Sequence, residues 1–362
     1  MNNRRLRHAT TGLAAAAAVA LCGAVTGTPA QAVTGGSTGT VKTAAEFQLT
    51  IATEVDPQLT VRNADGTWTA WRSVPDMYYL PSATTSVTQV EAGGRTFLAA
   101  MGSAIQFLIR DTDGTWNSPT DLTAPIADEV PILHSGNTPP TARLTRLMGS
   151  AFVDNEFHLF ARTAAGSLHE AVRHGDGTWG TWQDVSVPGV LPGRITELSA
   201  VTLTGGDLQL LAVAGGKLWH TARAASASAF SAWSDVFAGS SGPGTAQHVS
   251  AAEVKGELQA VVTTGNGTGV YHAVRRTTGA WTVFGDVEAA TRTPLGTVTG
   301  VAVGGSNQYT DGDVLQVAVL DSNGKLFHTL RNANGTWTKF GSVDAATGAH
   351  FGTASAVLAS AR

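Results

Sequence analysis

The stretch LFHTLRNANGTWTKFGSV, residues 326–343, decides the fold because the chain repeats it with small changes. Residues 270–287 read VYHAVRRTTGAWTVFGDV, and residues 56–74 read DPQLTVRNADGTWTAWRSV. Each copy has an arginine, a short polar turn and an aromatic, and it closes on a small or acidic residue followed by a branched apolar one. A period near 50 residues is typical of solenoids, propellers and arrays.

Six copies align in this way. Their arginines are Arg62, Arg110, Arg173, Arg223, Arg275 and Arg331. The first aromatics are Trp68, Trp116, Trp179, Phe230, Trp281 and Trp337, and a second aromatic follows three residues later at Trp71, Trp182, Trp233, Phe284 and Phe340. Within a copy, short alternating or apolar runs separated by glycine pairs indicate four strands, the number in a propeller blade. The sequence therefore predicts an all-β fold, a six-bladed β-propeller with four-stranded antiparallel blades.

The two ends of the chain indicate how the ring closes. The first copy, from near Phe47, has room for only three strands before its tryptophans, whereas the chain ends in a strand-like run, residues 353–360 (TASAVLAS). A ring of sheets must protect its strand edges. We therefore expect the C-terminal strand to join blade 1 as its innermost strand.

Residues 1–32 have the pattern of a signal peptide. Arg4, Arg5 and Arg7 precede an apolar run at 12–25 and an A-x-A site ending at Ala32, after which we expect cleavage. The apolar run is too short to span a membrane, and the paired arginines leave both the twin-arginine and the general secretory route open. Residues 33–41 are expected to be a flexible lead-in and residues 42–362 a single propeller domain of a secreted, extracellular protein.

The composition of the chain argues against several classes of function. Cys22, the only cysteine, lies in the signal peptide, so the mature chain would fold without disulfides. Removing residues 1–32 also removes three arginines and lowers the net charge from -4 to -7, which argues against nucleic acid or anionic membranes as partners. The chain has no G-x-S-x-G, H-E-x-x-H or local zinc spacing. We therefore assign no catalytic residue, metal or cofactor.

The position three residues before each arginine varies among the copies. It holds Leu59, Phe107, Glu170, His220, His272 and His328. Residues three apart on a strand point to opposite faces, so a histidine could meet an arginine only across the junction of two blades. We expect such clefts at junctions 3/4, 4/5 and 5/6. The structural alternative is a histidine bonded to a backbone carbonyl and an arginine that pairs with the closing Asp.

The paired aromatics also have two interpretations. Because they too are three residues apart, one would pack on the following blade and the other on the preceding blade. Alternatively, an exposed ring would stack on the apolar face of a sugar.

Repeat ends such as WGTWQDV (179–185) and runs such as LWHTAR (218–223) resemble those of bacterial and fungal sugar-binding propellers, the fucose-binding and tectonin-like lectins. The resemblance covers residues 41–360. In the fucose-binding members, sugars sit between adjacent blades on an arginine, an acid and an aromatic. The resemblance and the His–Arg pattern together imply these candidate ligand-binding residues: Glu170, Arg173, Trp182, His220, Arg223, Trp233, His272, Arg275, Phe284, His328, Arg331 and Phe340. Histidines replace the acid at most of these positions.

We therefore expect a non-catalytic, lectin-like protein whose partners are glycans or glycosylated surfaces. One alternative is an extracellular protein-interaction scaffold that uses the insertion at residues 123–143. The other is an exported glycoside hydrolase, which needs two nearby carboxylates. The candidates for that pair are Asp154, Glu156, Glu197 and Glu253.

Overall fold

A computed structural model describes residues 46–53, 56–74, 84, 86–102, 104–122, 143–185, 191, 193–238, 242–305, 314–352 and 354–361. All of them belong to one compact unit, Lys42–Arg362. The predicted signal peptide, the predicted lead-in and residues 123–142 of the insertion lie outside the described residues. Within the described residues, no helix is both long enough and apolar enough to cross a membrane.

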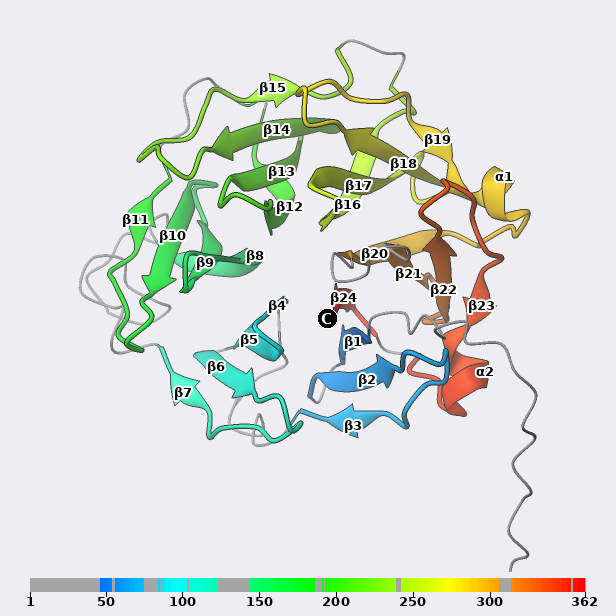
Figure 1. The fold of residues 1–362 in the computed structure, drawn as a ribbon, viewed down its shortest axis with the longest axis horizontal. Coiled ribbons are helices and arrows are strands. Elements are labelled where there is room, and N and C mark those ends of the chain that lie inside the picture. The colour runs from blue at the N-terminus through cyan, green and yellow to red at the C-terminus, as the bar shows by residue number, and fades with distance from the viewer. Residues whose placement is uncertain are drawn as a thin grey trace, which may run out of the picture. The chain divides into compact units, whose positions relative to one another are not determined.

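Six four-stranded antiparallel sheets form a ring of blades (Figure 1). From the centre outward, blade 1 contains β24 (Ala356–Ala361), β1 (Phe47–Ala52), β2 (Gln58–Arg62) and β3 (Arg72–Ser73). Blade 2 contains β4 (Ser86–Ala92), β5 (Arg95–Met101), β6 (Ile105–Arg110) and β7 (Thr120–Asp121). Blade 3 contains β8 (Leu144–Val153), β9 (Glu156–Thr163), β10 (Leu168–Arg173) and β11 (Gln183–Asp184). Blade 4 contains β12 (Ile195–Thr202), β13 (Leu208–Ala214), β14 (Lys217–Arg223) and β15 (Ser234–Asp235). Blade 5 contains β16 (Ala246–Val254), β17 (Glu257–Thr264), β18 (Gly269–Arg275) and β19 (Gly285–Asp286). Blade 6 contains β20 (Val298–Gly305), β21 (Leu315–Asp321), β22 (Leu326–Arg331) and β23 (Gly341–Ser342). The predicted six-bladed β-propeller is confirmed.

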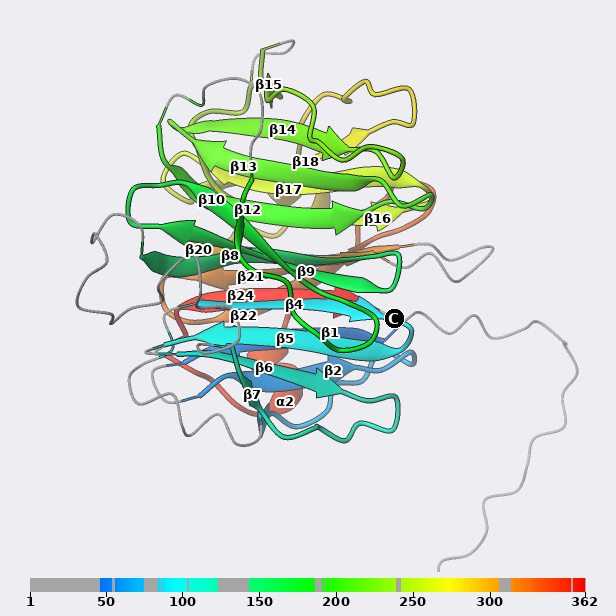
Figure 2. The ribbon, with the colours of Figure 1, turned by 90° about the vertical axis from the view of Figure 1, so that its left-hand side faces the viewer.

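The C-terminal strand closes the ring as predicted. β24 pairs with β1 in antiparallel register, from Phe47 opposite Ala361 to Ala52 opposite Ala356. Figure 1 shows β24 among the innermost strands, and in the side view of Figure 2 it lies next to β4. All six residues of β1 are buried, so blade 1 is complete only when the last strand of the chain has joined it.

The closing pair of each repeat turns the chain out of its blade. In blades 5 and 6 the polar member caps a short helix: Asp286 caps α1 (Val287–Thr291) and Ser342 caps α2 (Val343–Thr347). The side chains accept from the backbone N–H groups of Ala289 and Ala345, at 2.9 and 3.1 Å. The branched member, Val287 or Val343, is buried at the start of the helix. The pattern of a capping residue followed by an apolar residue thus ends the blade.

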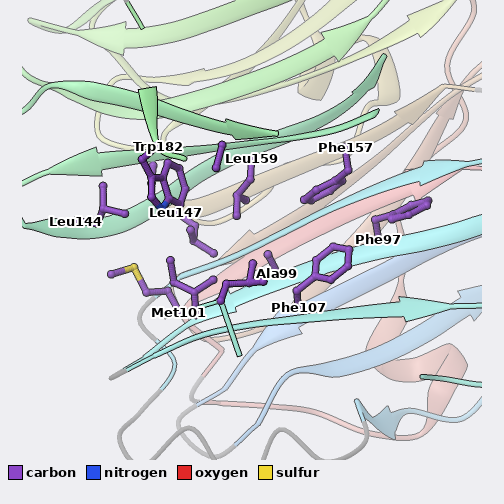
Figure 3. Close-up of a cluster of buried hydrophobic side chains, with 13 residues drawn as sticks. Phe97, Ala99, Met101, Phe107, Leu144, Leu147, Phe157, Leu159 and Trp182 are labelled. Atoms are coloured by element: carbon purple, nitrogen blue, oxygen red, sulfur yellow. The ribbon is translucent and has the colours of Figure 1, made fainter. Parts of the chain in front are cut away.

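The hydrophobic core lies between the blades. Figure 3 shows one such layer, in which Phe97, Met101 and Phe107 of blade 2 face Phe157 and Trp182 of blade 3. The aromatic rings of Phe107 and Phe157 are 5.2 Å apart, within the range of favourable aromatic pairs.

Both repeat aromatics pack on the preceding blade, which corrects the expectation that one packs forward and one back. Trp281 and Phe284 lie in the cluster between blades 4 and 5, and Trp337 and Phe340 lie in the cluster between blades 5 and 6. The rings of Trp281 and Trp337 lie 6.0 and 5.4 Å from His220 and His272 of the preceding blades. Across the ring closure, the indole Nε1 of Trp71 donates to Thr347 Oγ1 of α2 at 3.0 Å.

A shift in strand register explains this result. Trp337 lies opposite Arg331, and an unbroken ladder from that pair would place Gly341 opposite Phe327. Ser342 stands there instead, so one extra residue has been inserted between the two aromatics. Such an insertion reverses the alternation of side chains, and residues three apart then point to the same face. Blades 1, 3 and 5, which have this bridge and both aromatics, show the same register shift.

Candidate functional site

The polar turn of each repeat positions its arginine. In blade 6, Asn334 Oδ1 accepts from both the backbone N–H and the hydroxyl of Thr336, at 3.0 and 2.7 Å. Gly335 has φ +86°, and a side chain there would begin 3.3 Å from Arg331 Nη2, so the guanidinium lies against the glycine. The same arrangement recurs at Gly66, Gly114, Gly177 and Gly279 with their arginines. The Asp-Gly-Thr and Asn-Gly-Thr runs are therefore turn-forming elements that hold an arginine in place.

Five of the six repeat arginines face the preceding blade, at the position that varies among the repeats. Arg223 binds Glu170, and the Arg173 guanidinium lies 5.5 Å from the centre of the Phe107 ring. Burial lowers the pKa values of His220, His272 and His328, and the positive charges of Arg275, Arg331 and Arg62, respectively, add to the shifts. Inter-blade His–Arg pairs therefore exist, but they lie at junctions 4/5, 5/6 and 6/1. The expected pair at junction 3/4 is replaced by Glu170 and Arg223, because the variable side chain points to the following blade.

Junction 3/4 contains a buried ionic network. Glu170 is bound by both terminal nitrogens of Arg223, each at 3.0 Å, and by His158 Nδ1 at 2.6 Å. The Arg223 guanidinium lies 4.8 Å from the centre of the Phe230 ring. Burial raises the pKa of Glu170, but the hydrogen bonds from His158 and Arg223 outweigh burial and lower the pKa below its usual range. Glu170 is therefore ionised and fully engaged within the protein.

Removing one member of this network should be costly. We expect Arg223→Met to lower the free energy of unfolding by about 3–5 kcal/mol, because it leaves the carboxylate of Glu170 buried without its bidentate partner. Arg275→Met is the matched control, since Arg275 occupies the equivalent place in blade 5 but faces the neutral His220. Urea unfolding at pH 7.5 measures both. Equal losses in the two variants would show that the arginine acts by packing alone.

The histidines at junctions 4/5, 5/6 and 6/1 are uncharged, and each is hydrogen-bonded to a glutamine. The Nε2 atoms of His220, His272 and His328 lie 2.8, 2.9 and 3.1 Å from the Oε1 atoms of Gln209, Gln259 and Gln316. Since an amide oxygen only accepts, each Nε2 carries a proton and donates it. Burial, and then the neighbouring arginine, lowers the pKa of each histidine to about 3. These imidazoles are uncharged at neutral pH and fix the orientation of the glutamine.

Sequence reasoning missed the glutamines. They stand on the second strand of their blades, each directly after a leucine, in the runs DLQLL, ELQAV and VLQVA. His158 occupies this place in blade 3, one residue beyond Phe157, which pairs with Arg173. The recurrent Leu-Gln pair was the available signal, because a polar residue in a buried strand needs a partner on the neighbouring strand.

The second aromatics divide by exposure. Trp182 is 1% exposed and Phe340 is 8% exposed, so packing occupies both rings and they present no stacking face. Trp233 and Phe284 are only partly buried against the clusters of the preceding blades. The structure thus gives Trp182 and Phe340 a packing role in place of the expected contact with a sugar.

Junction 5/6 contains a hollow of about 270 Å³. Arg331, Ala333 and Asn334 of blade 6 line one side, and Glu257 and Gln259 of blade 5 line the other. Burial lowers the pKa of Arg331, and the charge of Arg276 adds to the shift while that of Glu257 opposes it. Here a candidate arginine, held by its turn, faces open space.

A separate cavity of about 900 Å³ runs along the centre of the ring, lined by the innermost strand of every blade. Hydroxyl groups tie these strands together: Ser86, Ser199 and Ser250 accept backbone N–H groups of the next blade at 2.8 to 3.1 Å. Among the described residues, no group of three or more His, Cys, Asp or Glu side chains is arranged to hold a metal ion.

Comparisons with known proteins find similarity at the level of structure. No family model matches the chain, and no curated protein matches it. BP39L lectin from Burkholderia pseudomallei is 15% identical, with 83% of this chain and 85% of that chain covered and a TM-score of 0.49. The six-bladed lectin of Aleuria aurantia is 14% identical, with 86% and 97% covered and a TM-score of 0.47. NanB is 10% identical, with 72% and 61% covered and a TM-score of 0.51, so this chain spans less than two thirds of NanB.

Sugar-binding propeller lectins, as the repeat ends suggested, are thus among the solved structures that resemble this chain. At these identities the likeness concerns the fold, and what each of those proteins binds is a property of that protein. The function of this chain has to be argued from its own junctions.

Proposed function

We propose that this chain is a secreted, non-catalytic carbohydrate-binding propeller that takes sugars at the junctions between its blades. The observation that carries the proposal is the hollow at junction 5/6, where Arg331 faces Gln259 and Glu257 across about 270 Å³. Pockets for drug-sized ligands begin at roughly 300 Å³, so this hollow lies just below that range. A hollow of this size suits a single sugar ring.

The lining matches the chemistry of a sugar. Arg331 supplies a planar set of donors, and the carboxylate of Glu257, which also accepts from Arg276 at 2.8 Å, supplies acceptors for hydroxyl groups. His272 holds Gln259 Oε1 and thereby fixes this amide in the wall of the hollow. The apolar side chains of Val254 and Val274 provide surface for the C–H groups of the ring.

The same combination of a glutamine, a histidine and an arginine recurs at two other junctions of the ring. Gln209, His220 and Arg275 form it at junction 4/5, and Gln316, His328 and Arg62 form it at junction 6/1. Repeated weak sites on one rigid ring would increase the affinity for a surface that displays many copies of the sugar.

The spacing of Glu197 and Glu253 argues against their use as a catalytic pair. Glu197 and Glu253 both line the central cavity, but Glu197 lies 3.6 Å from His248 at the start of β16 and Glu253 stands five residues further along that strand. At ~3.4 Å per residue they are roughly 17 Å apart, beyond the ~5–10 Å of glycosidase pairs. Glu156 is hydrogen-bonded to His174 at 2.6 Å on the surface.

The experiment is binding to a panel of neutral and acidic glycans, with protein purified from the culture medium and its N-terminus, expected at Val33, read at the same time. We expect Arg331→Ala to weaken binding of the best glycan by about 10- to 100-fold, because hydrogen bonds to a charged donor are worth about 1.5–3 kcal/mol. Lys339→Ala, which removes an exposed cation of the same blade, is the control and should bind like the wild type.

Three results would overturn the proposal: no binding across the panel, equal binding by Arg331→Ala and the wild type, or turnover of chromogenic glycosides. The last result would favour an enzyme. Capture of a protein partner that does not depend on sugar would favour the interaction scaffold.

A further inference from the structure

One end of the central cavity carries an unusual concentration of arginine. The innermost strands run in the same direction, and at the end where they begin the cavity wall contains Arg146 of β8, Arg162 of β9 and Glu197 of β12. At the end where they finish, the wall contains Glu91 of β4 and Glu253 of β16. The cavity therefore has a basic end and an acidic end.

Two of the arginines are direct neighbours in the sheet. Arg146 and Arg162 lie opposite each other on the paired strands β8 and β9, beside a register irregularity. Like charges in this position destabilise a sheet. Arg162 is nevertheless only 8% exposed, and its Nε is buried without a hydrogen-bond partner among the described residues. Its Nη1 donates to the carbonyl oxygen of Ile195 at 2.5 Å.

The local charge is only partly balanced. Burial lowers the pKa of Arg162 to about 10, and the charges of Arg194 and Arg146 add to the shift while that of Glu197 opposes it. Glu197 accepts from Arg146 at 3.1 Å and lies 3.6 Å from His248 Nδ1. Among the described residues of this cluster, the negative charge of Glu197 stands against the positive charges of Arg146, Arg162 and the exposed Arg194, so the cluster carries excess positive charge.

From this geometry we infer that the basic end of the central cavity is a binding site for an anionic group, a carboxylate, sulfate or phosphate carried by a small ligand. Guanidinium groups suit such groups because their parallel donors match two oxygens at once. Bound there, the anion would relieve the repulsion between Arg146 and Arg162. The acidic far end would orient a ligand with its charge at the arginines and its neutral part along the cavity.

This site is separate from the inter-blade hollows. The hollow at junction 5/6 is lined by residues of blades 5 and 6, whereas the basic end is formed by β8, β9 and β12 of blades 3 and 4. The cavity volume of about 900 Å³ lies within the roughly 300–1,000 Å³ range of small-ligand pockets. A ligand larger than one sugar ring therefore fits.

The test is titration of the intact protein with sulfate, phosphate or glucuronate at constant ionic strength, followed by calorimetry and by the unfolding temperature. We expect at least one of these probes to bind saturably and to raise the unfolding temperature above that in matched chloride, whereas glucose does not. Sulfate and phosphate report an inorganic anion or an ester, and glucuronate reports a carboxylate on a sugar.

Substitutions of the two arginines test whether the anion binds at the basic end of the cavity. Arg146→Gln and Arg162→Gln should each raise the dissociation constant of the anion at least tenfold. If Arg162→Gln fails to fold, Arg146→Gln decides. Arg95→Gln, which removes an exposed arginine paired with Asp111 at 2.9 Å, is the control.

Arg331→Ala separates this inference from sugar binding at junction 5/6, because it should leave the anion titration unchanged. Stabilisation no greater than that by chloride, or anion binding that survives both Arg146→Gln and Arg162→Gln, would overturn the inference. Anion binding lost in Arg331→Ala but kept in these two variants would place the anion in the hollow and would also overturn it.

Discussion

A chain that ends at Gly352 should lose its cooperative folded state. The missing segment contains β24, which pairs with all six residues of β1 and contributes the buried Val357 to the contact between blades 1 and 6. Without it, the backbone groups of β1 on that side have no partner and an unprotected edge is exposed. We expect the truncated protein to aggregate, or to show no sharp transition in urea, whereas we expect the full chain to unfold in a single step.

A circular permutant provides the matched control. Because Ala361 lies opposite Phe47, residues 354–361 can be placed before residue 46 through a short hairpin loop, with the new C-terminus at Gly352. Blade 1 would then be continuous in sequence. We expect the permutant to unfold cooperatively, as expected for the full chain. A truncated chain that is as stable as the full one would contradict closure by the last strand.

Mild acid should destabilise the fold more than any single substitution at the junctions. In the folded protein the pKa values of His220, His272 and His328 lie near 3, whereas those of unfolded histidines are near 6.5. Below pH 6.5 the unfolded chain therefore takes up protons that the folded chain does not, and stability falls as pH falls. At pH 5 each histidine should cost about 2 kcal/mol, and the three together about 6 kcal/mol.

Urea unfolding at pH 7.5, 6.0 and 5.0 measures this loss. The control is the double variant Gln209→Phe/His220→Phe, which copies into blade 4 the Phe97 and Phe107 pair of blade 2, whose rings are 6.4 Å apart. Whatever its absolute stability, this variant should lose about 2 kcal/mol less than the wild type between pH 7.5 and 5. A free energy of unfolding that is constant over this range would show that the histidines are not buried as neutral groups. Below pH 5, protonation of Glu170 adds a loss of the same sign, because its folded pKa is lowered.

The ring itself could be predicted from the sequence, because six copies of one motif and an unpaired terminal strand leave few alternatives. The direction of the inter-blade contacts could not. The bulge that places Trp337 and Phe340 on one face adds a single residue, and no turn signal marks it in the sequence. The assignment of His328 to Arg62 depends on which face of β22 meets blade 1, and spacing along one strand cannot determine this.

The candidate site was predictable in part. The arginines and the variable position were visible because they recur at fixed spacing in six copies. The glutamines that hold the histidines escaped notice, since each lies on a different strand and the pairing appears only when β13 lies beside β14. The arginine cluster at the central cavity was hidden for the same reason, because Arg146 and Glu197 are far apart in sequence and come into contact only where blades 3 and 4 meet.

The central claim is that the junction arginines bind sugar, and the most direct measurement is a crystal structure of the protein soaked with the glycan that binds best in the panel. We expect density for a sugar ring in the hollow between blades 5 and 6, with its hydroxyl groups within hydrogen-bond distance of Arg331 and Gln259. A well-ordered glycan seated elsewhere on the protein, with that hollow empty, would contradict it.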